Sequence, residues 1–372
     1  MLKTWVCILN YSRMSRTIIS LHQVTNNYMN FSTLSHRKPQ PVPGISCLIV
    51  PALLYGCSIA ETLSPEMSPA MEESVISLDI KSTFGQLENA CLDIFIFNDD
   101  QLQRLDSYTR MERFSGNVVP VTSRSGEKIV FICINGQRSL YEWSEISSYS
   151  SLSGLRVNLE EESVERPVMT GEFRTSEDGR ILLAEVTPIA SMIELRSISS
   201  DFSGKPYQGM KITDAKVYLT NVNAEYPLIG GNSERPVRII NSGMLNSSET
   251  GRFNDRSIIV REMEEDIGTT GIKTGISLMC YPNCSVEEGL GAPFTRLVVE
   301  GRIGGSTCYW PINVNRHGAE AGGVARNCRY VYDIILKRKG TDDPDTPIDP
   351  EEFELNLTVM PWTEKEEYQV GF

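Results

Sequence analysis

The feature that most constrains the fold of this chain is a series of short apolar stretches separated by residues that favour turns. Val75 to Lys81 alternates polar with apolar side chains, and Cys91 to Phe97 and Lys128 to Ile134 are almost continuously apolar. The first pattern predicts a half-buried strand, and the other two predict strands at the centre of a sandwich. The intervening turn residues, such as those at 98–100, give the roughly 8–12-residue strand spacing that indicates β-sandwiches.

The second half of the chain has the same plan. Ile212 to Val222 alternates cleanly, Thr295 to Ile303 follows a long polar region, and Arg329 to Lys337 is the largest stretch of strand character. In the first half, the best helix candidate is Arg138 to Ser150, which places apolar residues on one helical face. We therefore predict an all-β chain with an N-terminal sandwich domain at 75–186 and a C-terminal one at 187–339.

The N-terminal region has the pattern of an export signal. A basic cluster at 36–38 precedes the apolar run Cys47 to Cys57, CLIVPALLYGC. About ten apolar residues are too few for a membrane-spanning helix, which needs roughly 20. Gly56 followed at once by cysteine resembles a bacterial lipobox, in which a peptidase cuts before the cysteine and its thiol carries a lipid. We predict a lipoprotein leader at 1–56, lipidation of Cys57 and a polar tether at 57–74.

Two alternatives stay open for this region. The apolar run could be a buried strand that happens to end in cysteine. Translation could also begin at Met14 or Met29 rather than at Met1, and a start at Met29 gives a leader of 28 residues.

The charge of the exported part argues against binding to nucleic acid. Residues 1–56 hold five of the 35 basic residues and no acidic ones, which leaves 30 basic against 48 acidic residues and a formal charge of −18. Such a chain is repelled by polyanions and by anionic lipid headgroups. We therefore expect no nucleic-acid partner.

Cysteine and histidine usage indicates neither a metal site nor a cofactor. After Cys57, the remaining cysteines are Cys91, Cys133, Cys280, Cys284, Cys308 and Cys328. Cys280 and Cys284 could form a loop disulfide or remain two thiols near solvent. They lack a second ligand pair at zinc-binding spacing, and His317 is the only histidine outside the leader.

The C-terminal region combines a linker with an alternating strand. Residues 340–352 are acidic and rich in proline, which excludes a helix or a central strand. The strand Glu354 to Val359 follows, with Leu355, Leu357 and Val359 on one face. Such a strand could fill a groove in a neighbouring molecule or lie at the edge of its own sheet.

Several stretches of this chain resemble the fimbrillins, the lipoprotein subunits of type V pili in Gram-negative anaerobes. The stretches are CLDIFIFNDDQLQRLDSYTR at 91–110, KITDAKVYLTNVN at 211–223, FTRLVVEG at 294–301, NCRYVYDIIL at 327–336 and the ending VMPWTEKEEYQVGF. The resemblance implies two transthyretin-like β-sandwich domains and lipid anchoring in the outer membrane. It also implies other fimbrial subunits as partners, adhesion as the outcome, and no enzymatic activity; the receptor stays open.

The resemblance also implies a mode of assembly. In stalk-type relatives a trypsin-like protease removes the first strand, and a C-terminal strand of the next subunit occupies the vacated groove. Carried over to this chain, the removable strand is Val75 to Lys81, and the donor is Glu354 to Val359 with the tail to Phe372. Between Cys57 and Cys91 the only basic residue is Lys81, at the end of that strand. We therefore expect an anchor or minor subunit that keeps its first strand, rather than a stalk or tip subunit.

Two other function classes compete with this interpretation. A surface glycan-binding lipoprotein could stack sugars on Tyr281, Tyr309 and Trp310, although strand aromatics more often belong to a core. A carboxylate-pair glycosidase could draw on the acidic runs at 160–165 and 262–266, which are more typical of solvated surfaces. Neither class requires the linker and alternating C-terminal strand.

Overall fold

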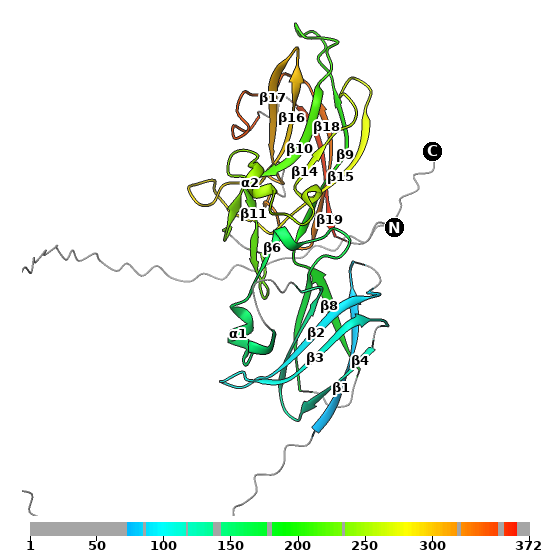
Figure 1. Ribbon diagram of the computed structural model, residues 1–372, viewed down its shortest axis with the longest axis vertical. Coiled ribbons are helices and arrows are strands. Elements are labelled where there is room, and N and C mark those ends of the chain that lie inside the picture. Colours follow the sequence, from blue (N-terminus) through cyan, green and yellow to red (C-terminus); the bar gives the residue numbers. More distant parts are fainter. Residues whose placement is uncertain are drawn as a thin grey trace, which may run out of the picture. The chain divides into compact units, whose positions relative to one another are not determined.

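The computed structural model describes residues 73–84, 87–116, 118–136, 143–176, 181–232, 235–317, 321–348 and 353–362. These residues form two β-sandwiches with short helical turns between strands (Figure 1), which confirms the predicted all-β fold. No helix within the described ranges is long and apolar enough to cross a membrane. The predicted leader, the lipidation site Cys57 and the tail after Trp362 lie outside these residues.

Seven strands build the first sandwich, and they follow the order β3-β2-β5-β7-β8-β1-β4. Their bounds are β1 Glu73–Ser82, β2 Ala90–Asn98, β3 Leu105–Phe114, β4 Val118–Arg124, β5 Lys128–Ile134, β7 Met169–Thr175 and β8 Ile181–Pro188. Strands β7 and β8 pair only through Met169–Pro188 and Thr170–Thr187, so the sheet divides there into two layers. A Cβ at Gly171 would lie 2.1 Å from the Glu185 carbonyl oxygen, so β7 can pass β8 this closely only with glycine.

The core of this sandwich comes from alternate residues of facing strands. Ile76, Leu78 and Ile80 of β1 are at most 1 % exposed and belong to one cluster with Leu92 and Ile94 of β2. The burial pattern of β1 is the alternation expected from its sequence. The opposite faces of β2 and β5 are also buried, since Phe95, Phe97 and Phe131 belong to a second cluster.

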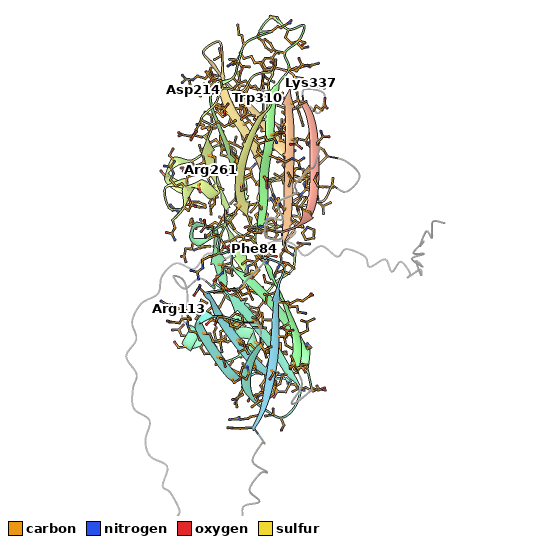
Figure 2. The ribbon with its side chains drawn as sticks, turned by 90° about the vertical axis from the view of Figure 1, so that its right-hand side faces the viewer. Phe84, Arg113, Asp214, Arg261, Trp310 and Lys337 are labelled. Carbon is orange, nitrogen blue, oxygen red and sulfur yellow. The ribbon has the colours of Figure 1, made fainter. Side chains whose placement is uncertain are left out.

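The second sandwich has two four-stranded sheets, with orders β14-β10-β16-β17 and β15-β9-β18-β19. Their bounds are β9 Ser191–Ser200, β10 Thr213–Thr220, β14 Val260–Glu262, β15 Ile272–Cys280, β16 Arg296–Ile303, β17 Ser306–Asn313, β18 Cys328–Leu336 and β19 Phe353–Pro361. Trp310 of β17 lies in its core (Figure 2) and is fully buried. Strand β9 pairs with β18 in parallel and with β15 in antiparallel orientation.

Short elements connect the strands. They are η1 Trp143–Glu145, α1 Tyr149–Ser153, β6 Arg156–Asn158, η2 Leu159–Glu161, β11 Val222–Asn223, β12 Glu225–Pro227, β13 Ile239–Ile240, α2 Ser247–Thr250 and η3 Arg256–Ile258. Of the helix expected from Arg138 to Ser150, residues 138–142 lie outside the described residues. The described remainder is not one continuous helix, because η1 ends at Glu145 and α1 begins at Tyr149. The Ser148 side chain accepts a hydrogen bond from the Ser151 N–H and completes a capping box there.

Strands β6 and β12 pair with each other, joining chain segments on either side of the expected domain boundary. That boundary, between residues 186 and 187, falls inside β8, and the next strand starts at Ser191. Nearby, the guanidinium of Arg326 donates to the carbonyl and hydroxyl oxygens of both Thr170 and Thr187. These contacts attach the loop before β18 to β7 and β8.

Candidate assembly surfaces

The first strand is held along both of its edges. Strand β1 pairs in antiparallel orientation with β4 from Glu73 to Asp79 and in parallel with β8 from Ser77 to Ser82. Its three fully buried side chains, Ile76, Leu78 and Ile80, contribute together roughly 5–9 kcal/mol of hydrophobic stabilisation before ordering costs. The groove that β1 occupies is therefore filled by the chain itself.

Lys81, the first basic residue after Cys57, lies within this paired region. Its backbone is in register with Glu185 of β8, and its exposed ammonium lies 4.0 Å from a carboxylate oxygen of Asp79. A protease binds its substrate in an extended conformation, so cleavage after Lys81 requires local opening of the β1–β8 pair. The residues that follow, 82–90, contain no lysine or arginine.

The C-terminal strand lies at the edge of its own sheet. Strand β19 pairs with β18 over its whole length, from Phe353–Leu336 to Pro361–Cys328. Leu355 and Leu357 are half-buried against the core, whereas Val359 is 43 % exposed. The expected apolar face therefore packs only in part, and β19 buries less than β1 does.

Both ends of β19 are anchored by aromatic side chains. Phe353, which begins the strand, is buried, and Trp362, which follows it, is 1 % exposed. The Trp362 ring packs edge-on against Phe84, with ring centroids 5.4 Å apart. Phe84 lies in the turn that follows β1 (Figure 2). Trp362, the last described residue, therefore contacts the turn after the first strand.

The linker is fastened to the sandwich through its described part. Thr341 and Tyr309 exchange two backbone hydrogen bonds of 2.8 and 3.0 Å, and the Ile348 N–H donates to the Pro311 carbonyl at 3.2 Å. Ile348 is 4 % exposed. The described part of the linker thus runs along β17, the edge strand of the other sheet.

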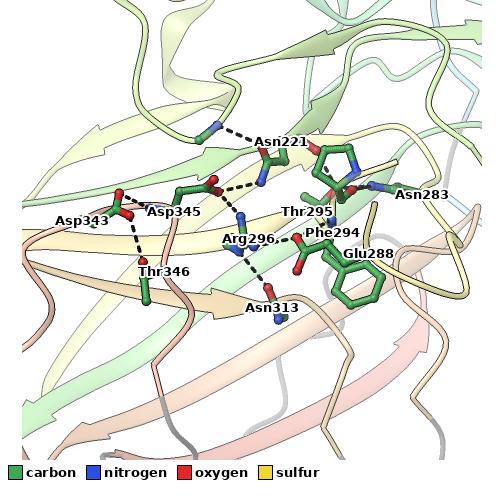
Figure 3. A network of polar contacts seen from close by, with 12 residues as sticks. Asn221, Asn283, Glu288, Phe294, Thr295, Arg296, Asn313, Asp343, Asp345 and Thr346 are labelled. Carbon is green, nitrogen blue, oxygen red and sulfur yellow. Dashed lines mark hydrogen bonds and ion pairs between the residues drawn. The ribbon is translucent and has the colours of Figure 1, made fainter. Parts of the chain in front are cut away.

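A buried arginine secures the middle of the linker (Figure 3). Arg296 is 3 % exposed, and its guanidinium donates to Glu288 at 2.6 Å, to Asn313 at 3.0 Å and to the carboxylate of Asp345. Asn221 also donates to Asp345, at 3.3 Å. Residue type and spacing gave no sign of this cluster, because its members come from distant parts of the chain.

The aromatic residues considered for sugar stacking do not form a platform. Trp310 and Tyr281 are fully buried, and the Trp310 indole N–H donates to the Arg338 carbonyl at 3.0 Å. Only Tyr309 is partly exposed. The expectation of a glycan-binding surface on these three residues is therefore wrong, since two of them belong to the core.

The two cysteines of the expected loop pair, Cys280 and Cys284, are free thiols. Cys280 is fully buried, and the Cys284 sulfur lies 3.2 Å from the Val324 carbonyl oxygen. The loop disulfide that was one of the two expected alternatives is not formed, and Cys280 is also not near solvent. No group of histidine, cysteine, aspartate and glutamate side chains in the described ranges could hold a metal ion.

Solved structures share this two-sandwich fold. A candidate cell adhesion protein from Bacteroides eggerthii matches with a TM-score of 0.59 at 15 % identity, covering 79 % of this chain and 97 % of its own. A fimbrilin from Porphyromonas gingivalis matches with a TM-score of 0.58 at 14 % identity, covering 80 % and 100 %. A candidate cell adhesion protein from Parabacteroides distasonis gives 0.57 at 16 % identity, covering 79 % and 98 %.

These matches confirm the fimbrillin resemblance at the level of the fold. No protein-family model matches the chain, and none of the curated protein sequences matches it.

Proposed function

We propose that this protein is a non-enzymatic structural subunit of a surface fimbrium that supports adhesion. The observation that carries the proposal is the contrast between its two terminal strands. Strand β1 fills an internal groove, whereas β19 is an edge strand that, among the described strands, pairs with β18 alone. Leu355, Leu357 and Val359 of β19 are the residues that would fill a neighbour's groove. The fold shared with a fimbrilin and with candidate cell adhesion proteins supports the same function.

We place the subunit at the base of the fimbrium, as an anchor or minor component. A subunit that keeps β1 has no vacant groove, so it can donate a strand but cannot accept one. The paired backbone at Lys81 and the absence of basic residues from 82–90 both oppose removal of β1. A lipid on Cys57 would then hold the subunit in the outer membrane, since each buried acyl methylene contributes about 0.8 kcal/mol.

Mass spectrometry of the protein purified from its native surface tests this placement. We expect the N-terminus at acylated Cys57, whereas an N-terminus at Ser82 would show that β1 is removed. The substitution Glu88→Arg puts a basic residue in the exposed turn before β2. In cells that carry the trypsin-like protease, this variant should lose β1 and the matched control Glu88→Gln should keep it.

A further inference from the structure

The C-terminal strand can reach a neighbouring molecule only if the linker leaves β17. Five residue steps separate the docked Ile348 from Phe353, which span at most roughly 18 Å when extended. That distance is shorter than a small domain, whose diameter is about 30 Å. Released from Gly340 onward, the linker has thirteen steps and spans roughly 45 Å. Whether β19 is available to a partner therefore depends on what holds the linker.

Asp345 makes the central contact between the linker and the sandwich. Its carboxylate accepts from Arg296 and from Asn221, which come from β16 and from the residue after β10 (Figure 3). Arg296 is buried, while the Asp345 side chain is 52 % exposed. Arg296 keeps Glu288 and Asn313 as partners when Asp345 departs, so opening leaves no uncompensated buried charge.

Hydrogen bonds within the linker form a turn that holds Asp345 in place. The carboxylate of Asp343 accepts from the Asp345 N–H at 3.0 Å and from the Thr346 hydroxyl at 2.8 Å. These hydrogen bonds lower the pKa of Asp343, with the bond from the Asp345 N–H as the main cause. A preformed turn reduces the conformational entropy lost when the linker docks.

We propose that the Arg296–Asp345 contact is a latch that keeps the C-terminal strand on its own sandwich until a partner displaces it. The latch retains β19 on β18 before assembly. It thereby keeps the edge of β18 covered, which would otherwise be open to non-specific strand pairing. Opening the latch removes the central contact of the linker, and the Thr341–Tyr309 and Ile348–Pro311 hydrogen bonds must open with it before the segment from Gly340 onward can leave β17. This role in assembly rests on the function proposed above, whereas the latch itself is a property of the isolated chain.

Hydrogen-exchange mass spectrometry of the full chain tests the latch. In Asp345→Ala, we expect amides of Thr341, Ile348 and β19 to exchange about ten- to a hundredfold faster, in line with the loss of hydrogen bonds to a charged group. Amides of β9 should keep their rates. The matched control is Asp342→Ala, which removes the same charge from an exposed linker position outside the Arg296 cluster. Unchanged exchange in Asp345→Ala, or an equal rise in β9, would overturn the latch.

A second readout separates the latch from the proposed function. If the function is right, purified fimbriae contain the wild-type chain, and Asp345→Ala enters them faster than Asp342→Ala does. Equal rates of entry would overturn the role of the latch in assembly. If hydrogen exchange in Asp345→Ala rises as expected but neither the wild-type chain nor any variant is found in fimbriae, the latch stands and the proposed function fails.

Discussion

At the scale of single residues, the most unusual group is the carboxyl of Glu162. It is almost fully buried, and it accepts hydrogen bonds from the Val168 N–H at 3.1 Å and the Tyr281 hydroxyl at 2.9 Å. Burial raises its pKa from the ordinary value of 4.5 to about 7, against the opposing effect of these hydrogen bonds. The folded state therefore binds the proton of the Glu162 carboxyl more tightly than the unfolded state does.

This pKa predicts a stability that falls as pH rises. The contribution of Glu162 is fully present below about pH 4.5 and is lost as pH rises through about 7. Urea unfolding at pH 5 and pH 8 should show a loss of about 2 kcal/mol from this group. Glu162→Gln should remove that part of the pH dependence, and the exposed control Glu127→Gln should not. An identical pH dependence in wild type and Glu162→Gln would contradict the assignment.

At the scale of elements, β1 offers a matched pair of positions on its two faces. Leu78 is fully buried in the first core, whereas Val75 on the opposite face is 53 % exposed. Leu78→Ala should reduce the free energy of unfolding by about 2–5 kcal/mol through lost burial and the cavity left behind. Val75→Ala should change it by about 0.5 kcal/mol at most. Chemical denaturation measures both, and equal costs would show that β1 is not the inner strand described.

Alternation made β1 predictable, because a strand with one buried face places every second side chain in the core. The same argument found the polar and apolar faces of β19, but it gave no indication that Val359 would remain exposed. Pairing partners were beyond sequence reasoning, since β1 joins β4 and β8 through contacts up to about a hundred residues away. The Arg296–Asp345 contact and the Phe84–Trp362 contact were missed for the same reason.

Taken as a whole, the molecule has the two-sandwich fold of a fimbrilin and of candidate cell adhesion proteins, and the proposed function makes it part of a fimbrium. Immunogold electron microscopy of native cells, with a strain lacking the chain as control, tests whether this chain is part of a fimbrium. We expect gold particles at the bases of fimbriae on wild-type cells, and fewer or detached fimbriae on cells without the chain. Gold spread over the cell surface, with unaltered fimbriae in the deletion strain, would contradict it.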